Sequence, residues 1–307
     1  MNMSLIDGPI PLILQLLALI TILVAIGRGR SRQWLLRWIL VAVLVGVASA
    51  ISAALYIRHQ GWATGPISFG TMFWIGMFGF AVAVLIAGWR GNGWWRRLVS
   101  LLSVPLVMVC GLVALNAGTG YLPTVRAAWL RITGAEPEQF IDEAQLAALR
   151  QKGEIPTRGT AVRVSSPSDA SGFAHRPEVV YLPPAWFASN PPPALPAVIM
   201  LAGEFGHPDD WLVSTNALQT LDKFAALHHG NAPVVVFPDI GGRFNNDTEC
   251  VDGSRGNAAA HLTEDVVPYL ISRFAVSSNR QNWGLVGWSS GGTCALLTAV
   301  RNPDMFR

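Results

Sequence analysis

The five residues Gly287-Trp288-Ser289-Ser290-Gly291 decide how the second half of this chain is expected to fold. An apolar segment that ends at Val286 precedes them, and a segment rich in alanine and leucine follows them. A strand, a tight turn flanked by glycines and a helix, in this order, form a nucleophile elbow, which exposes a serine Oγ. The alternative is a glycine–serine turn before an ordinary helix, and the strand–turn–helix context disfavours it. The pattern therefore predicts Ser289 as a catalytic nucleophile.

A serine nucleophile that attacks a carbonyl also needs two hydrogen-bond donors for the negative charge that develops on the carbonyl oxygen. In a nucleophile elbow one donor is the backbone amide after the serine, which here belongs to Ser290. The second donor comes from the loop after the third core strand, which in this chain covers residues 202–211. Gly203 permits a tight turn in that loop. The backbone amide of Glu204 is therefore the predicted second donor.

Short apolar strands alternate with helical segments through the second half of the chain. Strands are predicted at residues 161–164, 177–182, 195–201, 232–237 and 282–286. Helices are predicted between them at residues 215–227 and 262–274, and a short one is predicted earlier, at 139–150. This alternation predicts a parallel sheet covered by helices on both faces, and hence an α/β fold.

Several segments of this half resemble the esterase D and antigen-85 mycolyltransferase family. The resemblance runs from about Gly159 to the end of the chain. It rests on residues 200–211, Pro238-Asp239-Ile240-Gly241-Gly242, residues 246–250, residues 263–270 and the elbow with its continuation to Phe306. One departure is Ala202, which stands where that family usually has His or Asp. The resemblance implies an α/β-hydrolase fold and an exported carboxylesterase or acyltransferase that works through an acyl-serine intermediate.

The proton acceptor for Ser289 is not evident in the sequence. In α/β-hydrolases an acid and then a histidine follow the serine, but here only eighteen residues follow Ser289, none of them histidine. The one acid among them, Asp304, lies in a pattern typical of a helix end. We expect a chain truncated after the elbow, with both triad partners beyond residue 307 and little esterase activity in residues 1–307 alone. The alternative is a base supplied by an earlier histidine: His207, which we interpret as a loop histidine, His228, His229 or His261.

The first half of the chain has the composition of a membrane protein. The whole sequence is 51% hydrophobic and only 13% charged, whereas soluble domains are about 25% charged. Four apolar stretches, each close to the roughly 17–25 residues that cross a bilayer, occupy residues 10–26, 35–57, 67–89 and 98–115. We predict a four-helix transmembrane anchor over residues 1–122, a linker with a short helix over 123–158 and the hydrolase domain over 159–307.

The arginines between these stretches predict the orientation of the anchor. The first connection carries Arg28, Arg30, Arg32 and Arg37, the second carries Arg58, and the third carries Arg90, Arg96 and Arg97. Because positive charge favours the cytoplasmic side, connections one and three are predicted inside, and both termini and the hydrolase domain outside. The stretches contain no Asp, Glu or Lys, which favours an anchor over an ion path. Gly46, Ser49, Gly76 and Gly79 are candidate contacts between helices.

No cofactor and no metal site is predicted. The chain has neither a GxGxxG nor a Walker loop. Asp247, Glu249 and Asp252 lack the spacing of an EF-hand, so we interpret them as a solvated loop rather than calcium ligands. The three cysteines lack zinc-site spacing. We expect Cys250 and Cys294 to be separate thiols, although export would permit a disulfide between them.

The expected partners follow from the two halves of the chain. They are a lipid bilayer and an ester or acyl-lipid substrate, for example a lipid ester or a mycolyl ester. If the reaction is acyl transfer, a sugar is the expected acceptor. The formal charge of +3 is too small to indicate nucleic-acid binding, which we do not expect. The leading hypothesis is thus a membrane-anchored extracytoplasmic serine esterase or acyltransferase. The alternative is a catalytically inactive, hydrolase-like envelope-binding module on a membrane anchor.

Overall fold

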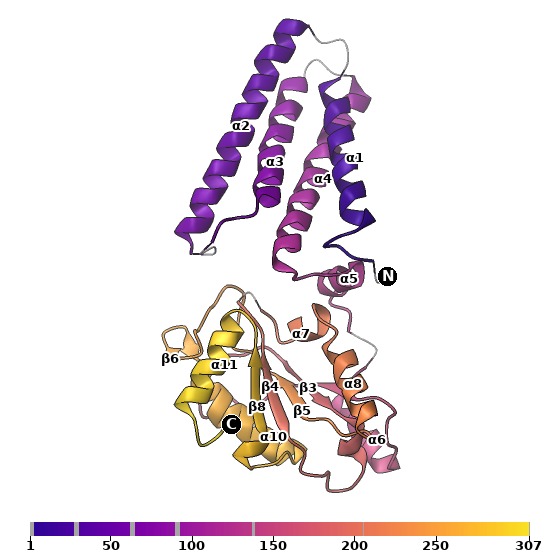
Figure 1. Ribbon diagram of the computed structural model, residues 1–307, viewed down its shortest axis with the longest axis vertical. Coiled ribbons are helices and arrows are strands. Elements are labelled where there is room, and N and C mark those ends of the chain that lie inside the picture. The colour runs from indigo at the N-terminus through magenta and orange to yellow at the C-terminus, as the bar shows by residue number, and fades with distance from the viewer. Residues whose placement is uncertain are drawn as a thin grey trace. The chain divides into compact units, whose positions relative to one another are not determined.

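A computed structural model describes residues 3–27, 31–61, 65–89, 93–136, 139–204 and 206–306. The chain divides into two compact units, Met1–Ile132 and Thr133–Arg307, and each is described by itself (Figure 1). The predictions that use Arg28, Arg30 and Arg90 fall outside the described residues. The domain bounds predicted from the sequence stay a prediction.

The first unit consists mainly of four long apolar helices. They are α1 (Pro9–Ile26), α2 (Arg32–His59), α3 (Phe69–Gly88) and α4 (Trp94–Thr119), and a short helix, α5 (Val125–Thr133), follows them. The first four are long and apolar enough to cross a membrane, which confirms the predicted apolar helices. Large apolar side chains on them, among them Leu23, Leu44 and Ile86, are exposed. Such faces suit a hydrocarbon surrounding and not water.

Small residues bring α2 and α3 close together. A Cβ added to Gly46 would lie 2.7 Å from the carbonyl oxygen of Gly76, and a Cβ on Gly79 would collide with the side chain of Ser49. The four small residues singled out in the sequence therefore face one another across this pair of helices. Close approach of backbones through small residues is a common way for apolar helices to pack where lipid surrounds them.

The second unit is built on a six-stranded sheet with the strand order β1-β2-β3-β5-β4-β8. The strands are β1 (Phe140–Ile141), β2 (Thr160–Val164), β3 (Glu178–Leu182), β4 (Ala197–Leu201), β5 (Val234–Phe237) and β8 (Trp283–Gly287). The longer helices are α6 (Glu143–Lys152), α8 (Ala217–Leu227), α10 (Val267–Phe274) and α11 (Ser290–Arg301). The shorter elements are η1 (Pro184–Phe187), α7 (Asp210–Val213), α9 (Ala258–Ala260), η2 (His261–Val266), η3 (Arg280–Asn282) and the hairpin β6 (Asp252–Gly253) with β7 (Gly256–Asn257).

The prediction of a parallel sheet is wrong for one strand, β3. Strand β4 pairs in parallel with β5 and β8, but β3 runs antiparallel to both β2 and β5. Parallel neighbours usually need a crossover helix between them, and residues 165–177, which join β2 to β3, contain none. The predicted helix 262–274 is also divided, because its first part, η2, is a π-helix. The predicted helix 139–150 starts later, because Phe140–Ile141 pairs with β2.

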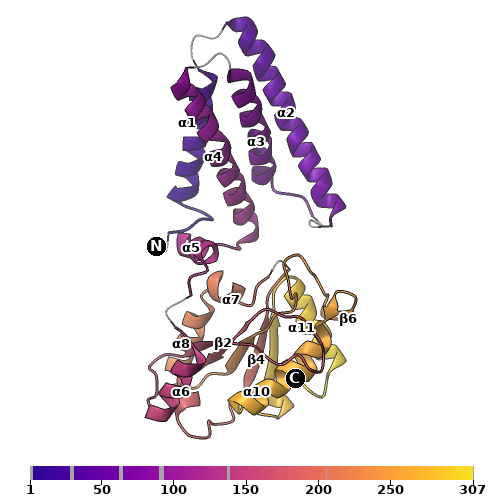
Figure 2. The ribbon, with the colours of Figure 1, turned by 180° about the vertical axis from the view of Figure 1, so that it is seen from behind.

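Apolar side chains fill both faces of the sheet, as expected for an α/β fold. On one face Leu146 of α6 and Leu270 and Phe274 of α10 belong to the larger core, and on the other face Leu212 and Leu218, of α7 and α8, belong to the smaller one. Figure 2 shows the same unit from behind, with α8 and α10 on opposite sides of the strands. The parallel strands β4 and β8 lie side by side, so the loops at their carboxyl ends meet at one edge of the sheet.

Candidate active site

Ser289 forms the turn between β8 and α11 with the backbone strain that a nucleophile elbow requires. Its φ is 55° and its ψ is −130°, a combination that residues other than glycine rarely adopt. A Cβ on Gly291 would collide with the carbonyl oxygens of Leu201 and Ala202, and one on Gly287 would collide with the backbone of Gly291. The two flanking glycines are therefore needed for close approach, and they leave the Ser289 side chain exposed.

The loop that follows β4 lies directly beside the elbow. Leu201 is in register with Gly287 at the ends of their strands. A Cβ added to Gly203 would lie 3.0 Å from the Cβ of Ser289. The amide of Gly206 donates to the carbonyl oxygen of Gly203 over 2.9 Å, and this bond closes a turn that contains Glu204. The structure thus brings together the three residues that the sequence proposes for catalysis.

A pocket opens at this edge of the sheet. Glu204 and Ser290 line it, together with residues 202–203, 206–208, 238–241, 243 and 246–248 from the loops after β4 and β5. Burial and the neighbouring charge of Asp247 raise the pKa of Glu204, against an opposing effect of Arg255. The pocket wall therefore carries carboxylates, those of Glu204 and Asp247 among them, near the elbow. The catalytic roles of Ser289, Ser290 and Glu204 stay predictions.

Of the four histidines considered as possible bases for Ser289, His207 lines this pocket. Its Nδ1 lies 3.4 Å from Oδ2 of Asp209. Burial would raise the pKa of Asp209, but hydrogen bonds from His207 and Arg163 lower it further than burial raises it. The sequence-based interpretation of His207 as an ordinary loop histidine missed its place in the pocket.

The other three histidines lie elsewhere. His228 and His229 follow the end of α8 and are exposed, with the ring of His228 stacked on Phe224. His261 is completely buried in the π-helix η2. The structure therefore leaves His207 as the pocket histidine among the residues it describes.

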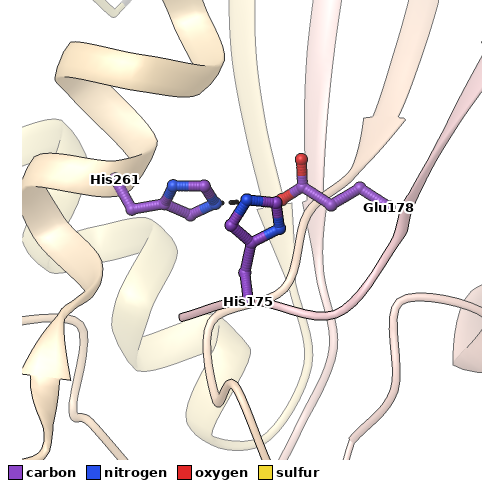
Figure 3. Close-up of side chains that lie close together, drawn as sticks. All are labelled: His175, Glu178 and His261. Carbon is purple, nitrogen blue, oxygen red and sulfur yellow. Dashed lines mark hydrogen bonds and ion pairs between the residues drawn. The ribbon is translucent and has the colours of Figure 1, made fainter. Parts of the chain in front are cut away.

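Behind the pocket wall lies a buried charged cluster that the sequence did not reveal (Figure 3). Nε2 of His261 lies 3.1 Å from Oε1 of Glu178, and Nδ1 lies 3.5 Å from Oδ2 of Asp265. The ring of His175 stacks on His261 with 4.5 Å between ring centroids. Burial opposes the protonation of His261, but the two carboxylates outweigh burial and raise its pKa. The sequence offered one local sign of this cluster, the four-residue spacing of His261 and Asp265. Glu178 could not be recognised as a partner, because it is 83 residues from His261 in the chain.

The same cluster places three potential metal ligands together. One atom each from His175, Glu178 and His261 lies within 4.8 Å of the others. The two imidazole planes are only 26° apart in a stack, so their in-plane lone pairs do not converge on one ion about 2.0–2.1 Å from both nitrogens. Both nitrogens of His175 also face carbonyl oxygens, at 2.9 and 3.0 Å. As arranged, the three side chains do not present converging ligand atoms to one metal ion.

Cys250 and Cys294 form a disulfide, which corrects the expectation of separate thiols. Their Cα atoms are 5.1 Å apart although 44 residues separate them in the chain, so no local pattern signals the pairing. The bond ties the loop after β5 to α11, the helix that starts at the elbow. Within the same loop Asp247 accepts a hydrogen bond from the amide of Glu249, and Asp252 accepts one from Ala260. These two acids accept hydrogen bonds from different segments of the chain.

Comparisons with known proteins agree with this geometry. Residues 175–307 match a family model described as "Putative esterase". An uncharacterised protein of Corynebacterium glutamicum is 28% identical over 316 residues, in an alignment that covers 99% of this chain and 71% of that protein. The family match includes Ser289 and every segment of the pocket. Together with the elbow it supports an ester hydrolase.

Two solved structures are also similar in part. A ferulic acid esterase is 21% identical with a TM-score of 0.43, over 50% of this chain and 57% of its own. The CE1 ferulic acid esterase of the anaerobic fungus Anaeromyces mucronatus, in complex with ferulic acid, is 20% identical with a TM-score of 0.40, over 48% of this chain and 56% of its own. This chain spans little more than half the length of these esterases.

Proposed function

We propose that this protein is a membrane-anchored, extracytoplasmic serine esterase or acyltransferase that acts on lipid or other acyl esters, mycolyl esters among them. The observation that carries the proposal is the strained backbone of Ser289, whose φ is 55°, directly before Ser290, which lines the pocket. Strain of this kind persists only where the surrounding structure enforces it, and it clusters at active sites. The match of residues 175–307 to an esterase family supports the same reaction class.

In the proposed reaction, Oγ of Ser289 attacks the ester carbonyl as its proton passes to a base. The amides of Ser290 and Glu204 donate hydrogen bonds to the oxyanion that forms. Collapse of this intermediate expels the alcohol and leaves the acyl group on Ser289. Water, or the hydroxyl of a sugar, then attacks the acyl-serine and regenerates the free serine.

The location outside the cytoplasm has two independent supports. The arginine-rich connections of the helical unit favour the cytoplasmic side, so that the chain leaves α4 on the opposite side. The Cys250–Cys294 disulfide suits an oxidising compartment, because cytosolic thiols are kept reduced. The membrane-spanning role of α1–α4 is supported by their length and their exposed apolar side chains.

Labelling with a fluorophosphonate probe tests the proposal. The full-length protein in detergent is expected to react at Ser289 and to hydrolyse a p-nitrophenyl ester. Ser289→Ala is expected to abolish labelling and to lower turnover by at least about a thousandfold. Ser290→Ala is the matched control, because the proposed donor is its backbone amide, and it should retain labelling. A wild-type protein whose Ser289 resists the probe would instead support a catalytically inactive envelope-binding module.

A second experiment separates hydrolysis from transfer, which use the same residues. The full-length protein is incubated with a lipid ester in the presence and absence of trehalose. A new glycolipid that depends on Ser289 indicates acyl transfer, whereas free acid alone indicates hydrolysis.

A further inference from the structure

Arg176 connects the two loops that form the candidate pocket. Its Nη2 donates to the carbonyl oxygen of Gly206 over 2.8 Å, in the loop after β4. The same guanidinium holds Asp239, after β5, with Nε at 2.9 Å from Oδ2 and Nη2 at 2.6 Å from Oδ1. The flat guanidinium fork is what allows one side chain to bond a carboxylate twice and still reach a second acceptor.

The Asp239 end of this bridge is fixed firmly. The Asp239 side chain is only 1% exposed, and its carboxylate also accepts hydrogen bonds from the amides of Arg176 and Gly241. Burial would raise the pKa of Asp239, but the hydrogen bonds and charge of Arg176 lower it. The amide of Asp239 donates to Oε1 of Glu178, 3.0 Å away, which joins the bridge to the His261 cluster.

The Gly206 end of the bridge lies at the turn that contains the candidate oxyanion donor, Glu204. Gly206 closes the turn onto Gly203, with its amide 2.9 Å from the Gly203 carbonyl oxygen. Gly203 in turn lies against Ser289, and Glu204 lies inside this turn. Arg176 therefore bonds the last residue of a turn whose first residue, Gly203, lies against Ser289.

We propose that Arg176 is a positioning residue of the ester-cleaving site. Arg176 ties the turn that carries the Glu204 amide to the buried carboxylate of Asp239. This inference rests on the proposed function. Arg176 does not touch the reacting atoms and acts through the turn. An oxyanion donor that shifts relative to Ser289 stabilises the transition state less, while the binding of the ground state changes little.

Arg176→Lys is the decisive variant. Lysine keeps a positive charge beside the buried Asp239 carboxylate, but its single ammonium lacks the fork that joins Asp239 to Gly206. With a p-nitrophenyl ester and the full-length protein in detergent, kcat is expected to fall about 10- to 100-fold, and KM to change less than about threefold. Unfolding curves of both proteins establish that the variant is folded.

Arg150→Lys is the matched control. Arg150 also uses its guanidinium for a side-chain hydrogen bond, to Asn190, but it belongs to α6, and Asn190 does not line the pocket. Its replacement should leave kcat and KM unchanged. A folded Arg176→Lys protein with wild-type kcat, or with KM alone altered, would overturn the inference.

Chemical rescue separates positioning from a general loss of structure. Arg176→Ala is assayed with added guanidinium and with an equal concentration of sodium chloride. Guanidinium alone should restore part of the lost kcat, and no restoration under conditions where the variant is folded would count against the inference. Failure of the proposed function itself is recognised separately, because the wild-type protein would then neither label at Ser289 nor turn over the ester.

Discussion

The two units of this protein satisfy their polar groups in opposite ways. In the helical unit the hydroxyl groups of Thr21, Ser49 and Ser103 donate to carbonyl oxygens three or four residues earlier in the same helix. In the α/β unit Arg176 pairs with Asp239 across 63 residues, and Glu178 meets His261 across 83. An α-helix completes its hydrogen bonds within a turn, whereas a buried charge requires a partner that the fold brings from another element.

This contrast teaches where the two units are vulnerable. A local hydrogen bond of this kind can be lost at little cost, because the acceptor carbonyl keeps its backbone N–H donor within the helix. Loss of one member of a buried pair leaves an uncompensated charge that no solvent reaches. The long-range contacts also lie behind the candidate pocket, so their loss should affect both stability and activity.

Glu178→Ala breaks the long-range system at its centre and should have the largest effect. It removes the acceptor for His261 Nε2, for the hydroxyl of Ser166 and for the amide of Asp239. The free energy of unfolding of the α/β unit should fall by about 3–5 kcal/mol, as measured by urea unfolding with tryptophan fluorescence. Glu143→Ala, at an exposed position of α6, is the control. A loss of less than about 1 kcal/mol, the scale of a single ordinary hydrogen bond, would contradict this account.

Removal of the disulfide breaks a covalent long-range contact. Cys250→Ser removes the cross-link between two positions that are 44 residues apart, so the unfolded chain gains conformational freedom. The free energy of unfolding should fall by about 2–4 kcal/mol. Thiol titration of the denatured protein checks the premise. One free thiol, that of Cys110, is expected before reduction and three after it. Three thiols without reductant would refute the disulfide.

The pH dependence of stability sharpens the comparison with a smaller effect. Glu178 on β3 and Asp265 on η2 raise the pKa of His261 above its usual value of about 6.5, with His175 stacked on the ring. The stabilisation by protonated His261 is complete below the unfolded-state pKa and is lost as pH rises through the folded-state pKa. The melting temperature of the α/β unit should therefore fall on the alkaline side.

The same unit should also lose stability in acid. The folded-state pKa values of Asp239 and Asp265 are lowered, so the stabilisation by their carboxylates is present above pH about 3.9 and is lost as pH falls through the folded-state pKa values.

Melting temperatures of wild type and His261→Gln, measured across both the acid and the alkaline range of pH, provide the check. An alkaline decline that is the same in both proteins would rule out His261 as its source.

The smallest effect is expected where the α/β unit uses a local contact. Asp142 caps α6 in a capping box with Gln145, three residues later. Asp142→Ala should cost about 1 kcal/mol, measured in the same urea experiment, with no change in ester turnover. A loss as large as that from Glu178→Ala would remove the distinction between local and long-range contacts.

Much of this protein could be predicted from short segments. Composition alone indicated four apolar helices, and the glycines around Ser289 indicated the strained turn, because both depend on residues adjacent in the chain. The orientation of β3 was missed, because a strand pattern is the same in parallel and antiparallel pairs and the lack of a helix in residues 165–177 was not used. The place of His207 in the pocket was also missed. The pocket forms only where the loop after β4, which contains His207, meets the loop after β5, which is distant in the sequence.

The sequence by itself determined the local conformations: apolar helices long enough to span a bilayer, alternating strands and helices, and the elbow that exposes Ser289. The tertiary structure alone decided the partners of the buried charges. Arg176 meets Asp239, His261 meets Glu178, and Cys250 meets Cys294 only in the folded unit, because each pair joins residues far apart in the chain. The physical reason is that local conformation depends on backbone sterics and hydrogen bonds within a few residues, whereas burial of a charge is stable only when the whole fold delivers its counter-charge.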